Sequence, residues 1–333
     1  MHFQLHQISK NFQQQPILKG IDLSLREGEI VALLGESGSG KSTLLRIAAG
    51  LLDADEGWVS LDNQRLPSAS DQLIPGHPDI KIVHQDYQLS LPLTVRENIS
   101  YALRFYEKNY RDERTQELIE LCQLDNVADQ TTKVLSGGEK QRTAIARALA
   151  EEARILLLDE PFAHLDWPNR RRLSDTVREL VEETGVACLF VTHDATDALS
   201  LSHRMGILQN GQLLQVGTPE EVYRRPVNAY TAALTGETNL LDKSFFEKHF
   251  DRSVGHRLSD DWVLIRPELL TIQATQHHDS FKATVNRCTF VGHQYRVEVL
   301  VENQTLVVYH TQRLPHGQSV RINEMSEHDQ TTP

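Results

Sequence analysis

The sequence predicts an α/β fold, with a mixed sheet in the first part of the chain and a small β-barrel at the end. Three short apolar runs, at 29–35, 153–160 and 186–193, have the composition of buried strands. The stretch 167–184, between the second and third runs, has the spacing of a helix. A strand, a helix and a second strand in this order predict parallel strands covered by helices.

The patterns along the chain also predict two domains. Residues 3–34 and 205–217 alternate apolar and polar side chains, which is typical of strands, and Asn210-Gly211 marks a hairpin turn in the second stretch. The last part of the chain consists of short β-rich runs separated by turns. We therefore predict a first domain over residues 1–236 and a β-rich domain over 237–333.

The composition limits the classes of function that fit. The formal net charge is −12, whereas nucleic-acid binders usually carry a basic surface, so we expect no nucleic-acid partner. Cys122, Cys188 and Cys288 are odd in number and far apart, which favours reduced thiols in a cytosolic protein. The N-terminus lacks the apolar core of a signal peptide, and no apolar run approaches the roughly 18 residues of a membrane span. A partner would have to supply any membrane-spanning helices.

Residues 35–43 read GESGSGKST and fit the phosphate-loop pattern G-x-x-x-x-G-K-[ST]. The motif lies between a buried strand and a helix pattern, where backbone N–H groups and the helix N-terminus together attract phosphate. We expect Lys41 to reach the β- and γ-phosphates of a nucleotide and the Ser42 hydroxyl to ligate Mg²⁺. The residues predicted to contact the nucleotide here are Gly35, Ser37, Gly38, Ser39, Gly40, Lys41, Ser42 and Thr43.

The run ILLLDE at 155–160 contains four aliphatic residues followed by two acids. A buried strand that ends in Asp159 would place this carboxylate at the carboxyl edge of the sheet, near the phosphate loop, to hold Mg²⁺ directly or through water. Glu160 would then polarise the water that attacks the γ-phosphate. Taken alone, the same run also fits an ordinary strand that ends at a polar turn.

A second small-residue turn precedes a helix pattern at 135–150, which reads LSGGEKQRTAIARALA. Ser136, Gly137 and Gly138 at a helix N-terminus form an anion-binding arrangement, although a capped helix start explains the same pattern. Because the phosphate loop already serves one nucleotide, a second anion site would need another nucleotide. A second copy of the chain, or a related chain facing it head to tail, is the natural source.

With these motifs in this order, the chain resembles the ATP-binding subunits of ABC transporters. The family's signature LSGGQ is present with Glu139 in place of Gln, and Gln85 matches the glutamine of the family's Q-loop, which touches Mg²⁺. His193 matches the switch histidine that contacts the γ-phosphate. Asp166 matches the D-loop, and Phe12 matches the aromatic that stacks on adenine.

The resemblance covers about residues 1–235 and implies a helical subdomain at about 86–150. It also implies an ATPase with Mg²⁺ as cofactor, in which two subunits sandwich two ATP molecules. Each ATP would lie between the Lys41 loop of one subunit and the Ser136–Glu139 turn of the other. The implied catalytic residues are Lys41, Glu160 and His193, and the implied metal ligands are Ser42, Gln85 and Asp159.

The stretch LIRPELLTI at 264–272 resembles the start of the regulatory TOBE-like domain in importer ATPases for sugars, polyamines, sulfate, molybdate and ferric iron. This resemblance implies a peripheral subunit at the cytoplasmic face of the cell membrane, docked on multi-span permease subunits and served indirectly by an extracytoplasmic solute-binding protein. The second nucleotide-binding subunit is expected to be an identical copy, because one chain carries every motif. His277-His278 matches no known metal-ligand spacing, so we expect no metal site there.

Two alternatives remain open from the residues. An exporter ATPase also lacks spanning helices when encoded separately, but such ATPases usually end near residue 235. A non-transport ABC ATPase that acts on nucleic acid or the ribosome is the second alternative. Its chromosome-type members have long coiled coils between the phosphate loop and the signature, and its translation-type members have two nucleotide domains in one chain. Neither feature is present here.

Overall fold

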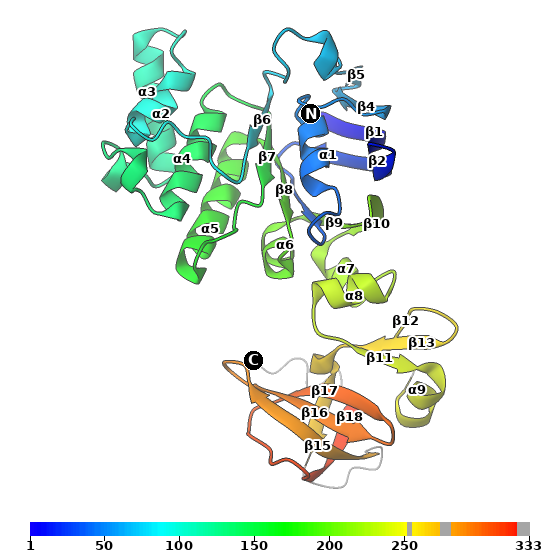
Figure 1. The fold of residues 1–333 in the computed structure, drawn as a ribbon. Helices are drawn as coiled ribbons and strands as arrows, with labels where there is room; N and C mark the ends of the chain where they lie inside the picture. Colours follow the sequence, from blue (N-terminus) through cyan, green and yellow to red (C-terminus); the bar gives the residue numbers. More distant parts are fainter. Residues whose placement is uncertain (252–254, 274–280, 325–333) are drawn as a thin grey trace. The chain divides into compact units, whose positions relative to one another are not determined.

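The computed structural model describes residues 1–251, 255–273 and 281–324 (Figure 1). His277-His278 lies outside the described residues. The chain forms two compact units, Met1–Val222 and Tyr223–Pro333. This division falls earlier in the chain than the domain boundary that the sequence suggests at 236/237. All three cysteines are free thiols.

A six-stranded mixed sheet forms the centre of the first unit. Its order is β10-β9-β3-β8-β7-β6, and all neighbouring strands are parallel except β9 and β10. The strands are β3 (Ile30–Leu34), β6 (Ile80–Val83), β7 (Ile155–Asp159), β8 (Ala187–Thr192), β9 (Arg204–Gln209) and β10 (Gln212–Gly217). The β9–β10 hairpin turns at Asn210 and Gly211, both with positive φ, as the sequence predicts.

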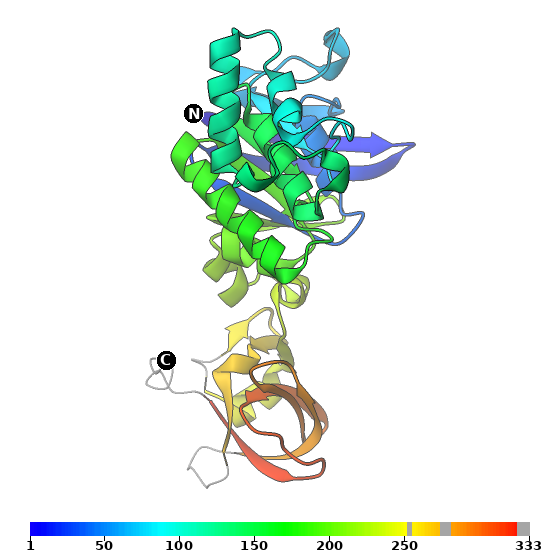
Figure 2. The same ribbon diagram turned by 90° about the vertical axis from the view of Figure 1, so that its left-hand side faces the viewer.

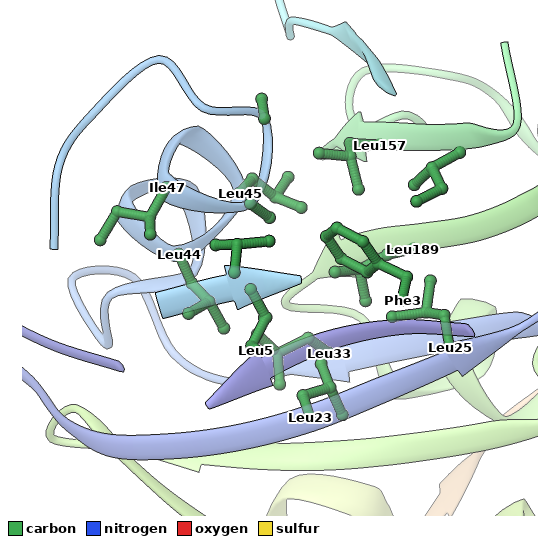
Figure 3. Close-up of a cluster of buried hydrophobic side chains, with 14 of the residues drawn as sticks. Phe3, Leu5, Leu23, Leu25, Leu33, Leu44, Leu45, Ile47, Leu157 and Leu189 are labelled. Carbon is green, nitrogen blue, oxygen red and sulfur yellow. The ribbon is translucent and has the colours of Figure 1, made fainter. Parts of the chain in front are cut away.

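An antiparallel sheet of order β2-β1-β4-β5 forms the second layer of this unit. Its strands are β1 (His2–Phe12), β2 (Gln15–Arg26), β4 (Glu56–Leu61) and β5 (Gln64–Arg65). Alternating side chains of β1 and β2 are buried, and helix α1 (Lys41–Ala48) adds Leu44 and Leu45 to the same core. Figure 3 shows these leucines with Leu5 of β1, Leu157 of β7 and Leu189 of β8 in one cluster. Helix α1, which directly follows the phosphate loop, is thus packed into this core.

Helices form one side of the first unit, and Figure 2 looks onto them. They are α2 (Val95–Ala102), α3 (Lys108–Leu121), α4 (Gly137–Leu149) and α5 (Trp167–Thr184). Helix α4 packs against α2, α3, α5 and strand β6. The shorter helices α6 (Ala195–Leu201) and α7 (Pro219–Arg224) follow β8 and β10. Among the described residues, no helix is both long enough and apolar enough to span a membrane.

The second unit is β-rich, as the sequence predicts. A five-stranded antiparallel sheet has the order β14-β18-β15-β16-β17, and its end strands β14 and β17 also contact each other. Its strands are β14 (Leu270–Gln273), β15 (Phe281–Phe290), β16 (Tyr295–Val301), β17 (Gln304–His310) and β18 (Ser319–Glu324). The remaining elements are α8 (Ala229–Thr235), β11 (Asn239–Asp242), α9 (Lys243–His249), β12 (His256–Arg257) and β13 (Trp262–Ile265).

Arg266 explains why the second unit begins ahead of the predicted boundary. Its guanidinium is buried and donates hydrogen bonds to the carbonyls of Tyr223, Ala232, Gly236 and Glu237 at 2.7–3.3 Å. It also donates to the Thr235 hydroxyl at 2.9 Å. These bonds fix residues 223–237 to the start of the barrel, so this segment is part of the second unit. A side chain that reaches back over some 30–43 residues in this way is not visible in a local sequence pattern.

Candidate nucleotide-binding and hydrolysis site

The phosphate loop joins β3 to α1 and has a backbone that only glycine tolerates at two positions. Gly38 and Gly40 have φ of 81° and 106°, and a Cβ on Gly40 would stand 2.9 Å from the carbonyl oxygen of Ile17. Gly35 needs its hydrogen for a different reason, because a Cβ there would stand 2.4 Å from the carbonyl oxygen of Leu208. Ser37 and Thr43 lie in the same loop and first helical turn. The sequence motif is therefore matched by the loop conformation it requires.

Lys41 is the buried cation of this loop. Its Nζ donates to the carbonyls of Gly35 at 2.8 Å and Glu36 at 2.9 Å, and it lies 3.8 Å from Oε1 of Glu160. Burial lowers the pKa of the Lys41 ammonium, whereas the nearby carboxylates of Glu160 and Asp159 raise it. The two carbonyls and the carboxylate aim the ammonium along the loop toward the carboxyl edge of the sheet.

Ser42 and Asp159 come together from α1 and the end of β7. The Ser42 hydroxyl donates to Oδ1 of Asp159 at 2.9 Å. Burial raises the pKa of the Asp159 carboxyl; the Ser42 hydrogen bond and the charge of Lys41 oppose this, and the charge of Glu160 adds to it. A hydroxyl and a carboxylate at this spacing are two oxygen donors of the kind that Mg²⁺ binds.

Glu160 and His193 follow directly after the neighbouring strands β7 and β8. Nδ1 of His193 and Oε2 of Glu160 are 2.6 Å apart. Glu160 has φ of 50°, a left-handed conformation that is uncommon outside glycine, while its backbone N–H donates to the Val191 carbonyl at 3.1 Å. Strain of this kind at the end of a strand is typical of functional positions. Because β3, β7 and β8 are parallel neighbours, their carboxyl ends bring all these groups to one edge.

Two observations show that the phosphate loop fits a nucleotide phosphate. The Ser39 hydroxyl is buried without a hydrogen-bond partner in the part of the chain that the structure describes, although buried polar groups are normally paired. The loop also leads into the N-terminus of α1, which has no side-chain cap. A bound phosphate would supply the missing acceptor for these donors.

Gln85 lies near the same edge but on its own loop. It is exposed and follows β6, which pairs with β7 so that Val83 stands opposite Leu158. His84 is close enough to Asp159 for its charge to lower the pKa of that carboxyl.

Phe12 is at the end of β1, with 45% of its surface exposed and the Nζ of Lys10 5.7 Å from its ring centroid. An exposed ring of this kind is available for stacking.

Ser136 to Glu139 form the start of α4 with a complete capping box. The Ser136 backbone N–H donates to the Glu139 carboxylate at 2.8 Å, and the Glu139 N–H donates to the Ser136 hydroxyl at 3.4 Å. The hydrogen bond from the Ser136 hydroxyl lowers the pKa of Glu139, and burial opposes this. The capped helix start that the sequence leaves open is thus present, with Ser136 and Gly137 exposed and Gly138 buried against Asn169.

Asp166 is the N-cap of α5, where its carboxylate accepts a hydrogen bond from the Asn169 N–H at 3.2 Å. Across the described residues, none of Phe12, Gln85, Ser136–Glu139 and Asp166 forms a hydrogen bond with the phosphate loop. One chain therefore assembles Lys41, Ser42, Asp159, Glu160 and His193, and it leaves the other predicted contacts on separate surfaces.

Two side-chain arrangements near the site are absent from the sequence predictions. Arg170 of α5 pairs with Asp194 and lies 3.5 Å from Asp197, two carboxylates that follow His193 in the chain. Arg147 of α4 donates to the carbonyls of Tyr87 and Gln88, just after Gln85. The carboxylates of Asp194 and Asp197, close to His193 in the sequence, could have indicated a nearby cation. The arginines themselves come from other elements, so no local sequence pattern predicts them.

The strand–loop–helix and the converging carboxylates define a phosphate-loop nucleotide-binding ATPase. Residues 18–163 match the ABC transporter family, and residues 263–325 match the TOBE domain family. The chain is 35% identical, over 96% of its length and 94% of the relative's, to a spermidine/putrescine import ATP-binding protein of Spiroplasma citri. The chain belongs to the ATP-binding subunits of ABC transporters, and the predicted fold class and ATPase activity are confirmed.

Two further relatives define the extent of the similarity. A sulfate/thiosulfate import ATP-binding protein of Synechocystis sp. is 36% identical over 93% of this chain and 87% of its own length. The ATP-binding cassette MJ0796, solved as a dimer in a post-hydrolysis state with ADP and Pi, is 31% identical with a TM-score of 0.56. It covers 65% of this chain and 98% of its own. The sequence relatives thus extend through the second unit, whereas this solved cassette does not.

Proposed function

We propose that the chain is the ATP-hydrolysing subunit of an ABC importer, working with Mg²⁺ in a head-to-tail pair of nucleotide-binding subunits. The observation that carries this proposal is the convergence of Lys41, Ser42, Asp159, Glu160 and His193 at one edge of the sheet. Near-full-length similarity to import ATP-binding proteins supports the direction of transport. None of these relatives supports the exporter or non-transport alternative.

The proposed chemistry is mainly positioning and charge stabilisation. Lys41 exchanges its bonds to the loop carbonyls for bonds to phosphate oxygens. Glu160 orients the attacking water and accepts its proton, while His193 holds the Glu160 carboxylate by the 2.6 Å contact and faces the γ-phosphate. Mg²⁺, when bound by Ser42, Asp159 and Gln85, would neutralise charge on the phosphates.

The second subunit completes the proposed site. In one chain, Ser136 to Gly138 form a helix N-terminus that is exposed at Ser136 and Gly137 and does not bond to the phosphate loop. Each such turn would bind the nucleotide of the other subunit, so that ATP closes the pair and hydrolysis opens it. This is a ligand that shifts a two-state equilibrium by contacts present in only one state. A solved relative that is dimeric with ADP and Pi supports this arrangement.

The transported solute is proposed only as a class. The relatives are named for a polyamine cation and for an oxyanion, which have opposite charge, so similarity to them does not select one. We propose a small solute delivered by an extracytoplasmic binding protein to multi-span permease subunits. These permeases would hold the chain at the cytoplasmic face of the membrane.

The test is an ATP-dependent capture of the membrane partner. Tagged Glu160→Gln protein is mixed with detergent-solubilised membranes, with and without Mg-ATP, and co-purifying proteins are identified by mass spectrometry. We expect a multi-span membrane protein that is enriched with ATP, because ATP is bound and not hydrolysed. The matched control is the double variant Lys41→Met/Glu160→Gln, which should lose the ATP dependence.

The outcomes separate the two halves of the proposal. Recovery of soluble proteins or nucleic acid alone would reject the importer assignment and leave the ATPase assignment in place. Equal ATP dependence in the Lys41→Met control would reject the assignment of Lys41 to the nucleotide.

A further inference from the structure

The loop after β6 has a backbone conformation that needs external support. Tyr87 and Gln88 have φ of 63° and 49°, so two successive residues other than glycine are left-handed. Such residues persist where the surrounding structure over-determines them. Their N–H groups bond locally, to the carbonyls of His84 at 2.9 Å and Asp86 at 2.8 Å. We call residues 84–89 the Gln85 loop.

Arg147 supplies that support from helix α4. Its guanidinium donates to the Gln88 carbonyl at 2.6 Å and to the Tyr87 carbonyl at 3.2 Å. Within the described residues Arg147 forms no ion pair, and burial lowers the pKa of its guanidinium. A partly buried arginine whose hydrogen bonds all go to backbone carbonyls stabilises the conformation of that backbone.

The same loop touches α4 a second time, near the start of the helix. A Cβ on Gly137 would stand 3.6 Å from the Tyr87 hydroxyl, so this phenol lies beside the exposed glycine turn. Gly137 and Arg147 are ten residues apart, or roughly 15 Å along a helix. Tyr87 therefore meets α4 at two points, where its carbonyl accepts a hydrogen bond from Arg147 and where its hydroxyl lies beside the Gly137 turn.

The next segment of the chain is held by different groups. Asn98 of α2 bonds to the N–H and carbonyl of Ser90 at 2.9 and 3.1 Å. The Thr132 hydroxyl donates to the same carbonyl at 2.9 Å. Arg147 is thus specific to the turn that directly follows Gln85, and the segment from Ser90 onward has its own supports.

We propose that Arg147 is a positioning residue for ATP hydrolysis, which fixes the turn after Gln85 to helix α4 and so sets where the Gln85 side chain stands relative to Asp159. The register of β6 on β7 places Gln85 at the edge where Asp159 ends its strand. This inference rests on the proposed function, because it assumes that Gln85 serves the metal. It adds that helix α4, which begins at the Ser136–Gly138 turn, controls the position of the Gln85 side chain within the same chain.

The first test compares the Mg²⁺ requirement of full-length variants. Arg147→Met removes both hydrogen bonds, and we expect the Mg²⁺ concentration for half-maximal ATPase activity to rise about 10-fold, the lower end for residues that orient metal ligands. Arg147→Lys keeps the charge and one donor direction, so it should restore part of the loss. Binding of a fluorescent ATP analogue without Mg²⁺ should be unchanged, because the phosphate loop is intact.

The matched control is Arg114→Met. Arg114 of α3 is also mostly buried and also donates to a backbone carbonyl, that of Leu149 at 3.2 Å, but it does not touch the Gln85 loop. Its loss should lower the thermal midpoint and leave the Mg²⁺ requirement at the wild-type value. A general loss of packing in the helical region would move both variants alike.

A double variant shows whether Arg147 acts through Gln85. In a Gln85→Ala background, Arg147→Met should add no further rise in the Mg²⁺ requirement, since the two changes remove one function. A second readout, hydrogen exchange at residues 84–89, should be faster in Arg147→Met and unchanged in Arg114→Met.

Three results would overturn the proposal. They are an unchanged Mg²⁺ requirement in Arg147→Met, full additivity with Gln85→Ala, or unchanged hydrogen exchange in the Gln85 loop. If the wild-type chain showed no Mg²⁺-dependent hydrolysis at all, the proposed function would fail instead. Hydrogen exchange would still decide whether Arg147 holds the loop.

Discussion

Each unit contains a buried cation that illustrates a different role, Lys41 in the first unit and Arg266 in the second, and the two are satisfied in different ways. Lys41 of the first unit bonds to two loop carbonyls and is near one carboxylate, in a loop where the Ser39 hydroxyl has no partner among the described residues. Arg266 of the second unit donates to four backbone carbonyls and one hydroxyl and lies 3.9 Å from the ring centroid of Tyr223.

This difference in hydrogen-bond partners distinguishes Lys41, at a ligand-binding position, from Arg266, at a structural one. The bonds of Lys41 are to its own loop and can be exchanged for phosphate oxygens, whereas those of Arg266 join distant parts of the second unit. A cation whose partners are local and incomplete can accept a ligand at small cost, because little structure depends on its present bonds. A cation that joins residues 223–237 to the barrel cannot be redirected without loss of that structure.

The largest expected effect concerns the nucleotide site around Lys41. Glu160→Gln should lower ATP hydrolysis by about 10²–10⁴-fold, the usual size for a positioned acid–base group, and should leave ATP binding intact. Steady-state hydrolysis and equilibrium binding of labelled ATP would measure the two quantities separately. Glu151→Gln is the control, because Glu151 pairs with Lys81 on the surface and should change neither quantity. Normal hydrolysis in clean Glu160→Gln protein would show that Glu160 is not the catalytic carboxylate.

The second prediction tests the structural role of Arg266. Arg266→Met leaves the carbonyls that Arg266 serves without donors, and we expect the second unit to lose about 3 kcal/mol in free energy of unfolding. Urea unfolding followed by far-UV circular dichroism should show this loss in one of two transitions, while basal ATPase activity is retained.

Arg257→Met is the control for this loss, because Arg257 is exposed and pairs with the exposed Asp260. Equal unfolding curves for the two variants would mean that Arg266 is not a structural hub. If Arg266→Met lost ATPase activity but kept the wild-type free energy of unfolding, the distinction between Lys41 as a binding residue and Arg266 as a structural residue would be wrong.

The same comparison shows what the sequence could and could not predict. The phosphate loop, the Asp159–Glu160 strand end and the Asn210-Gly211 hairpin are local patterns, each with spacing dictated by a single turn or strand. The contacts of Arg266, Arg147 and Arg170 join residues that are 24–60 positions apart, and no periodicity marks them. The left-handed conformation of Glu160 was also unpredictable, because glutamate has no preference for it.

The smallest expected effect concerns Asp197, a carboxyl beside the site that is satisfied less well than either cation. Burial raises the pKa of Asp197 to about 6, with Arg170 opposing the shift and Asp194 adding to it. A carboxyl with a raised folded-state pKa binds its proton more tightly in the folded state than in the unfolded state. Its contribution to stability is therefore greatest below the unfolded pKa of 3.8 and is lost as the pH rises to about 6.

Asp197→Asn removes this titration, so between about pH 4 and 6 the wild-type protein should gain stability on acidification relative to the variant. The difference should approach about 1.4 kcal/mol per pH unit at most, as measured by urea unfolding of the first unit at several pH values. Asp194→Asn gives the opposite sign: burial alone would raise the pKa of Asp194, but the hydrogen bonds from Arg170 and the Thr196 N–H keep it lowered. Parallel pH curves for wild type and Asp197→Asn would show that Asp197 is as well solvated as a surface carboxylate.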